Sequence, residues 1–276
     1  MTNKPVPEGQ YATLPNGHTI HYLDQGSGTT VVFLHGSGSG ACGHSNFKGN
    51  YPALVEAGYR VIVQDLIGYG YSDKPDDIDY PLELFVQCVK QTLDTIGVTR
   101  CTLVGNSLGG AVAISLALKH PEILDRLVLL APGGVEEQAD YFKMPGMAKM
   151  KEVFTSPEPM TASRMLDFFR TVFTVNPDCV DEQLANERHA LMQLQNPRVM
   201  QSMRVPDMTA DLHRISCPAL GFWGMQDQLM PETGILKLAR NIPKLRMIVV
   251  PQCGHWVMIE HRDLFNRMLL DFLAHG

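Results

Sequence analysis

The stretch that most constrains this 276-residue chain is residues 104–110, which read VGNSLGG. They follow the apolar residues 101–103 and lead directly into the largely apolar run 111–118. A G-x-S-x-G pattern between a strand and a helix is typical of a nucleophile elbow, a turn so sharp that only glycine fits two residues either side of the serine. The start of the helix also presents unpaired N–H groups to an oxyanion. We therefore expect Ser107 to be a catalytic nucleophile.

Short apolar runs alternate with helical patterns along the first half of the chain. Residues 10–14 and 18–23 are joined by the turn sequence Pro-Asn-Gly and predict a β-hairpin at the start. The apolar runs that follow are typical of strands buried on both faces, with helices between them. This alternation predicts an α/β fold with a mostly parallel, doubly wound sheet. The expected strands include 31–34, 60–64 and 126–131, and the expected helices include 51–57 and 81–96.

The pattern changes over residues 136–205, where strands stop and prolines divide helical segments. Nine of the fifteen methionines fall within residues 144–208. Methionine adapts to irregular apolar space, so we expect residues 136–205 to form a helical lid over an apolar pocket, inserted after the sixth strand. Residues 1–135 and 206–276 would form the core. The alternative is a plain helical subdomain packed on the sheet.

Two strands after this insertion are each followed by a residue that a serine nucleophile needs. Asp227 lies in the loop after the apolar run 218–223, and His255 lies just past the run 245–250. An imidazole must take the serine proton, and a carboxylate must fix the tautomer of the imidazole. Because parallel strands end at one edge of a sheet, we expect both residues to converge on Ser107. The order Ser, Asp, His is the order of an α/β-hydrolase triad.

Composition excludes several classes of function. The formal net charge of −6 provides no basic surface for nucleic acid. The chain has no apolar stretch long enough to cross a bilayer, and residues 1–9 lack the apolar region of a signal peptide, so we expect a cytoplasmic protein without a membrane partner. Six cysteines are scattered without C-x-x-C pairs, which predicts free thiols and no metal site.

Several motifs lie together along the chain in a recognisable combination. They are HGSGSGA at 35–41, Ser45-Asn46, Gly105-Asn106-Ser107, Pro132-Gly133-Gly134 and Gly254-His255-Trp256. The combination closely resembles that of the meta-cleavage product hydrolases, carbon–carbon bond hydrolases of aromatic-compound degradation. The resemblance extends from the first hairpin to the last helix and is weakest in the lid. The sequence departs from the family pattern at Cys42, His44 and Leu108, which bear on the preferred C6 substituent rather than on the reaction.

The resemblance implies a reaction and a substrate. The family cleaves the C5–C6 bond of 2-hydroxy-6-oxohexa-2,4-dienoates to 2-hydroxypenta-2,4-dienoate and a carboxylic acid. We expect an aryl C6 substituent, as in 2-hydroxy-6-oxo-6-phenylhexa-2,4-dienoate, an intermediate of biphenyl degradation. No cofactor is implied, and a homo-oligomer is expected.

The resemblance also implies roles for residues outside the triad. The backbone N–H groups of Ser37 and Leu108 would form the oxyanion hole. Arg188 would bind the substrate carboxylate, with a surface arginine as the alternative reading. The remaining substrate-binding residues would be Gly38, Asn46 and Asn106, with Trp256 packed on the flat dienoate.

Two other functions fit the same triad. An ordinary carboxylesterase would use Ser107, Asp227 and His255 in the same way, and a ligand-binding receptor could retain them without turnover. Dehalogenases of this fold are excluded because they need a carboxylate nucleophile, which Ser107 is not.

Overall fold

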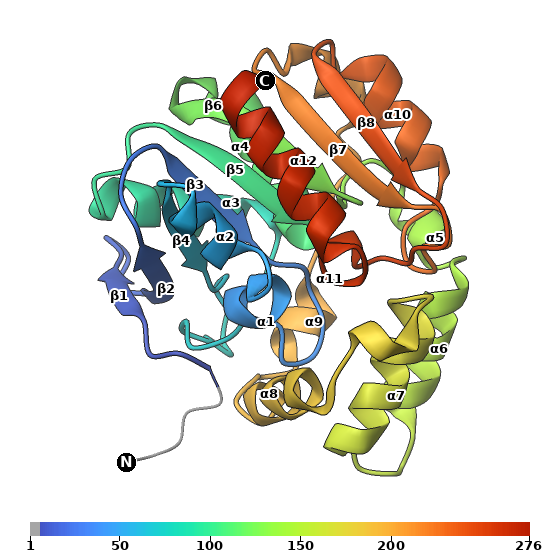
Figure 1. The fold of residues 1–276 in the computed structure, drawn as a ribbon. Helices are drawn as coiled ribbons and strands as arrows, with labels where there is room; N and C mark the ends of the chain where they lie inside the picture. The colour runs from blue at the N-terminus through green and yellow to red at the C-terminus, as the bar shows by residue number, and fades with distance from the viewer. Residues whose placement is uncertain (1–5) are drawn as a thin grey trace.

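The computed structural model describes residues 6–276 and is built around one eight-stranded sheet (Figure 1). Residues 1–5, part of the stretch that lacks a signal-peptide pattern, lie outside the described residues. The strand order is β1-β2-β4-β3-β5-β6-β7-β8. The strands are β1 (Gln10–Thr13), β2 (Thr19–Gln25), β3 (Thr30–Leu34), β4 (Arg60–Gln64), β5 (Cys101–Asn106), β6 (Leu124–Leu130), β7 (Ala219–Gly224) and β8 (Leu245–Val250).

The pairing of these strands matches the pattern of the sequence. The hairpin of β1 and β2 is antiparallel and joins β4 in antiparallel register, whereas all pairs from β4 to β8 are parallel. Every residue of β3, β5 and β7 is buried, as continuous apolar runs covered on both faces should be. The expected mostly parallel sheet is therefore confirmed.

Helices cover both faces of the sheet. In the view of Figure 1, α12 (Arg262–His275) crosses in front of the sheet, and it contacts α2 (Tyr51–Glu56) and α11 (Val257–Glu260). Helices α3 (Leu82–Thr95) and α4 (Leu108–Lys119) pack together behind it. The sheet is thus doubly wound, as predicted. The remaining core helices are α1 (Gly43–Phe47) and α10 (Thr233–Asn241).

A group of helices follows β6 and lies beyond the carboxyl ends of the strands (Figure 1). The helical insertion after the sixth strand is therefore confirmed, while its limits at residues 136 and 205 stay predictions. Two of its helices begin at side-chain caps, because Thr161 accepts from Arg164 N–H and Asp181 accepts from Leu184 N–H. The helices are α5 (Gln138–Tyr141), α6 (Pro145–Thr155), α7 (Ala162–Val172), α8 (Glu182–Met192) and α9 (Arg198–Ser202).

The described residues contain no helix that combines the length and the apolar character needed to span a bilayer. All six cysteines are free thiols, and four of them are buried.

Candidate active site

Ser107 occupies a strained turn between β5 and α4. Its backbone has φ 54° and ψ −114°, a conformation that L-residues rarely adopt. A side chain at Gly105 would collide with the carbonyl of Gly109, and one at Gly109 would collide with the carbonyl of Leu34. The two glycines of the motif are therefore required by close backbone approach, as the elbow pattern predicts.

His255 and Asp227 form a buried pair beside this turn. The Nδ1 atom of His255 lies 2.6 Å from Oδ2 of Asp227. The other carboxylate oxygen accepts from the N–H groups of Leu229 and Met230, at 2.8 and 3.0 Å. Because both oxygens are held, the carboxylate is fixed and the Nδ1 proton of His255 points to it. The Nε2 atom of the imidazole is left to exchange protons with a substrate or nucleophile.

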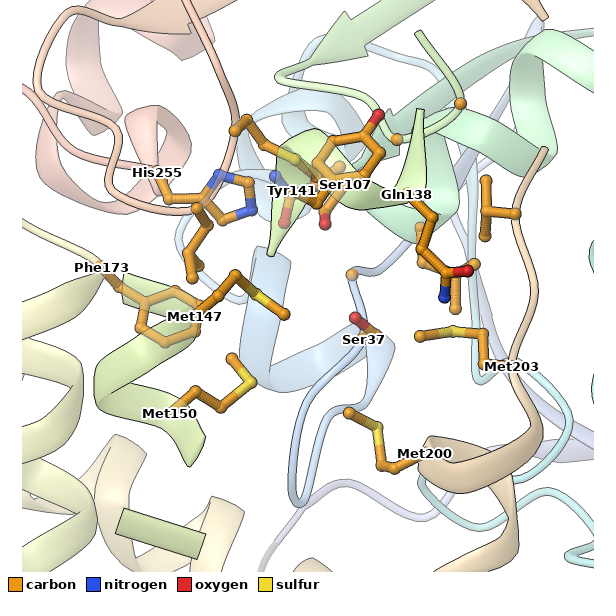
Figure 2. A pocket seen from close by; sticks show the side chains of 18 of the residues that line it. Ser37, Ser107, Gln138, Tyr141, Met147, Met150, Phe173, Met200, Met203 and His255 are labelled. Carbon is orange, nitrogen blue, oxygen red and sulfur yellow. The ribbon is translucent and has the colours of Figure 1, made fainter. Parts of the chain in front are cut away.

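His255 and Ser107 face the same cavity, as Figure 2 shows. The cavity has a volume of about 170 Å³ and also exposes Ser37 and Leu108. Leu108 is the first residue of α4, so its N–H has no partner within the helix. Ser37 belongs to the loop of residues 36–41, hereafter the oxyanion loop. The structure thus brings together the three expected triad residues and the two expected oxyanion donors.

His35 anchors the start of the oxyanion loop. Its ring lies 2.7 Å from the carbonyl of Gly36 through Nδ1, and Nε2 accepts from Leu66 N–H at 3.0 Å. Burial lowers the pKa of His35 to about 4, so the ring is neutral and its tautomer is set by these two bonds. This histidine belongs to the HGSGSGA motif, but its role could not be predicted from the sequence.

The two asparagines are linked but do not reach the cavity equally. Asn46 Nδ2 donates to Asn106 Oδ1 at 3.1 Å, and Asn106 Nδ2 donates to the carbonyl of Leu130 at 3.2 Å. Asn106 lines the cavity of Ser107, whereas Asn46 lies behind it and lines a separate cavity of about 110 Å³. In this conformation Asn46 reaches the site through Asn106.

Arg188 on α8 is buried, with 2% of its surface exposed, and is therefore no surface arginine. Its guanidinium carbon lies 5.2 Å from the ring centre of Phe169 and 5.3 Å from that of Trp256. Within the described part of the chain, its Nε and Nη1 atoms have no hydrogen-bond partner. Burial lowers the pKa of Arg188 to about 10, so the group stays charged at neutral pH. A buried, unpaired cation is a ready partner for an anionic ligand.

A second cavity, of about 970 Å³, joins Arg188 to the first. It contains Gly38, and its wall shares five side chains with the cavity of Ser107, so the two are neighbouring compartments under the inserted helices. Phe173 in this wall was not predicted from the sequence. It packs against Trp256, with ring centres 4.3 Å apart and planes tilted by 36°. The shared residues are Phe142, Met147, Met150, Phe173 and Met200.

The described residues hold no cluster of three or more His, Cys, Asp or Glu side chains that could bind a metal ion.

Comparison with known proteins gives one consistent result. Residues 31–268 match the model of the alpha/beta hydrolase family. The chain is 36% identical, over 93% of its length and 92% of the relative, to a 2-hydroxy-6-oxononadienedioate/2-hydroxy-6-oxononatrienedioate hydrolase of Comamonas testosteroni. It has the same identity and coverage with a 2-hydroxy-6-oxo-6-phenylhexa-2,4-dienoate hydrolase of Burkholderia cepacia.

A solved structure agrees with these relatives. A mutant of the meta-cleavage product hydrolase from Pseudomonas fluorescens IP01, complexed with acetates, superposes with a TM-score of 0.83. The identity is 27%, and the match covers 96% of this chain and 97% of that one. The chain therefore belongs to the meta-cleavage product hydrolases of the alpha/beta hydrolase family, enzymes that hydrolyse carbon–carbon bonds in the degradation of aromatic compounds.

Proposed function

We propose that the protein uses Ser107, Asp227 and His255 to hydrolyse the C5–C6 bond of a 2-hydroxy-6-oxohexa-2,4-dienoate with an aryl C6 substituent. The observation that carries this proposal is the division of the site into two compartments. One holds the unpaired charge of Arg188, suited to the substrate carboxylate, and the other holds the nucleophile among apolar side chains. A flat molecule that is anionic at one end and apolar at the other matches both.

The lining of the Ser107 compartment favours the aryl substituent. Curated relatives at similar identity are named for two kinds of substrate, one ending in a phenyl group and one in a second carboxylate. The described residues that line this compartment include neither lysine nor arginine. A carboxylate buried there without a cation would cost several kcal/mol. Five methionines line it instead and can adapt to an aromatic ring: Met147, Met150, Met200, Met203 and Met230.

The geometry supports a sequence of proton transfer, cleavage and hydrolysis. His255 would deliver to C5 the proton that the 2-hydroxyl group gives up, which converts the dienol into a ketone that can accept the electron pair of the breaking bond. Ser107 would then attack C6 while His255 takes its hydroxyl proton, with the oxyanion held by the N–H groups of Ser37 and Leu108. Cleavage of the C5–C6 bond would pass its electron pair into the ketone, and His255 would protonate the resulting enolate, which releases 2-hydroxypenta-2,4-dienoate and leaves the acyl group on the serine. Water, deprotonated by His255, would then free the carboxylic acid.

The test mixes the enzyme with two ring-fission products, one with a phenyl group and one with a propionate group on C6, and follows the loss of their yellow dienolate absorbance. We expect kcat/KM for the phenyl substrate to be higher by a factor on the order of a hundred, because a buried carboxylate finds no partner. Equal rates, or a preference for the dicarboxylate, would overturn the aryl assignment. Benzoate among the products identifies the bond that breaks.

The same assay separates the two rival functions. A carboxylesterase would hydrolyse p-nitrophenyl esters far faster than dienoates. A receptor would bind the dienoate without steady turnover. Multiple turnovers on the phenyl dienoate, at a rate above that on the esters, would exclude both.

We also propose a homo-oligomer. Strand β8 is the last strand of the sheet in the described residues, and Val249 on it is 39% exposed. Unprotected edges with apolar residues are sites of association between chains. Analytical ultracentrifugation tests this, and a monomer at micromolar concentration would contradict it.

The cytoplasmic location stays a prediction of the sequence, which cell fractionation can test.

A further inference from the structure

Gln195 connects the inserted helices to the oxyanion loop. It lies just after α8, and its Oε1 atom accepts from Gly40 N–H at 2.9 Å. Gly40 has φ 67°, and a side chain there would collide with the carbonyl of Arg188. The loop that carries Ser37 therefore rests on two residues of the insertion, the main chain of Arg188 and the side-chain amide of Gln195.

The other end of the Gln195 amide is unsatisfied. Its Nε2 atom is buried and has no hydrogen-bond partner among residues 6–276. Exchanging the oxygen and nitrogen would not relieve this, because Gly40 N–H needs an acceptor. A buried donor without a partner costs about 1–3 kcal/mol, so its retention needs a reason.

Gln195 shares its cavity with the unpaired guanidinium of Arg188. Both line the compartment of about 970 Å³, and Gly38 of the oxyanion loop lies there too. The described residues that line it include no aspartate or glutamate, so no carboxylate of the lining pairs with these donors. The neighbouring Glu187 is already bound by Lys48 and Gln183. The other cation in the lining, Lys151 on α6, is exposed and can be hydrated. A ligand rich in acceptor oxygens in this cavity would satisfy the unsatisfied donors of both side chains.

We propose that Gln195 is a substrate-binding residue whose Nε2 donates to the anionic end of the substrate beside Arg188, while its Oε1 holds Gly40 and the oxyanion loop. The identity of that anion as a dienoate carboxylate rests on the proposed function. Substrate binding then satisfies Gln195 and Arg188 together, and the same amide links the carboxylate end of the substrate to the loop that holds Ser37.

Two variants distinguish the contribution of the Gln195 donor from that of its acceptor. Gln195→Glu has nearly the same shape and keeps an acceptor for Gly40 N–H, but it places a negative charge where the donor was. Gln195→Met keeps the length and loses both bonds. Gln193→Glu is the matched control, since Gln193 is exposed, follows the same helix and does not line the cavity.

The measurement is calorimetric binding of hexa-2,4-dienoate, which lacks the C6 carbonyl and cannot react, with hexa-2,4-dien-1-ol as the neutral probe. We expect the Kd of the dienoate to rise about tenfold in Gln195→Met and on the order of a hundredfold in Gln195→Glu. Binding of the alcohol should stay within about threefold of wild type in Gln195→Glu, because the alcohol carries no charge to be repelled. Thermal unfolding of each variant shows that it is folded.

Several outcomes would overturn this assignment. They are unchanged dienoate binding in Gln195→Glu, equal weakening in Gln193→Glu, equal weakening for the alcohol, and a wild-type protein that binds no dienoate. Failure of the proposed function can be distinguished from failure of the Gln195 assignment. A wild type that binds hexa-2,4-dienoate in a Gln195-dependent way, yet cleaves no 2-hydroxy-6-oxodienoate, would refute the reaction and leave the role of Gln195 intact.

Discussion

Lys48 Nζ lies 2.9 Å from Glu187 Oε2, so an ion pair joins the end of α1 to α8 directly beside Arg188. The Glu187 side chain is only 5% exposed, and its other oxygen accepts from Gln183 at 2.8 Å. The pair therefore fixes the helix that presents Arg188 against the helix that carries Asn46. We expect this bond between two separate parts of the chain to contribute to both stability and substrate binding.

The variant Lys48→Met should show both effects. It leaves the Glu187 carboxylate buried without its cation, so we expect the free energy of unfolding to fall by about 1–3 kcal/mol, with a higher KM for the dienoate. Urea unfolding and steady-state kinetics measure these. Lys90→Met is the control, because Lys90 pairs with the exposed Asp94 and such pairs contribute less than about 1 kcal/mol. Equal losses in the two variants would contradict a special role for Lys48.

Ser107→Ala tests the nucleophile. The oxyanion donors and Arg188 remain in this variant, so we expect retained dienoate binding and a loss of kcat on the order of a million-fold. Ser115 is a buried serine of α4, the helix that follows Ser107, and it lines neither compartment. Ser115→Ala should therefore keep near-normal activity. Stopped-flow absorbance separates binding from turnover. A Ser107→Ala protein with a tenth of wild-type activity would exclude the serine mechanism.

The elements around Ser107 could be predicted because their signals are local. The strand, the glycines and the helix of residues 101–118 follow one another without a gap, and Asp227 and His255 each follow a buried strand. Parallel topology then brings the three loops to one edge. The structure adds what the pattern could not contain, such as the close approach of Gly109 to the carbonyl of Leu34, which leaves no room for a side chain.

The contacts of the inserted helices could not be predicted in the same way. The bond between Gln195 and Gly40 spans 155 residues, and no period or spacing encodes it. The same is true of Phe173 against Trp256. Asn46 was expected at the substrate, whereas it donates to Asn106 and lines a separate cavity. The sequence contains no signal for which of these two amides faces the cavity of Ser107. Helices α1, α10 and α11 are short and were not predicted.

His35 predicts a dependence of stability on pH. Its pKa is lowered to about 4 in the folded protein by burial, against an ordinary value of 6.5. Between these values the unfolded chain binds the proton and the folded protein does not, so acidification favours unfolding. We expect the free energy of unfolding to fall by up to about 3 kcal/mol as pH drops from about 6.5 to 4, with no further contribution from His35 below that.

The variant His35→Gln isolates this effect. Glutamine can still donate to Gly36 and accept from Leu66, but it does not titrate. Urea unfolding at pH 7 and pH 4.5 should show a difference in stability that is about 2 kcal/mol smaller in the variant than in wild type. The burial of His44 also lowers its pKa, so some dependence should remain. Parallel pH profiles of the two proteins would show that His35 is not the group responsible.

Arg188→Gln tests the proposed carboxylate site. Loss of the cation from a buried compartment leaves the substrate carboxylate unpaired. The activation free energy for kcat/KM with the dienoate should therefore rise by roughly 3–5 kcal/mol, which lowers kcat/KM. Part of this should appear in kcat, since the bound carboxylate also orients the reacting carbonyl. Hydrolysis of a p-nitrophenyl ester should change only a few-fold, because that substrate has no carboxylate. Arg198→Gln, at an exposed arginine of α9 paired with Asp79 at 2.8 Å, is the matched control. If the ester suffered as much as the dienoate, Arg188 would be a structural residue of the inserted helices, held there by its contacts with Phe169 and Trp256.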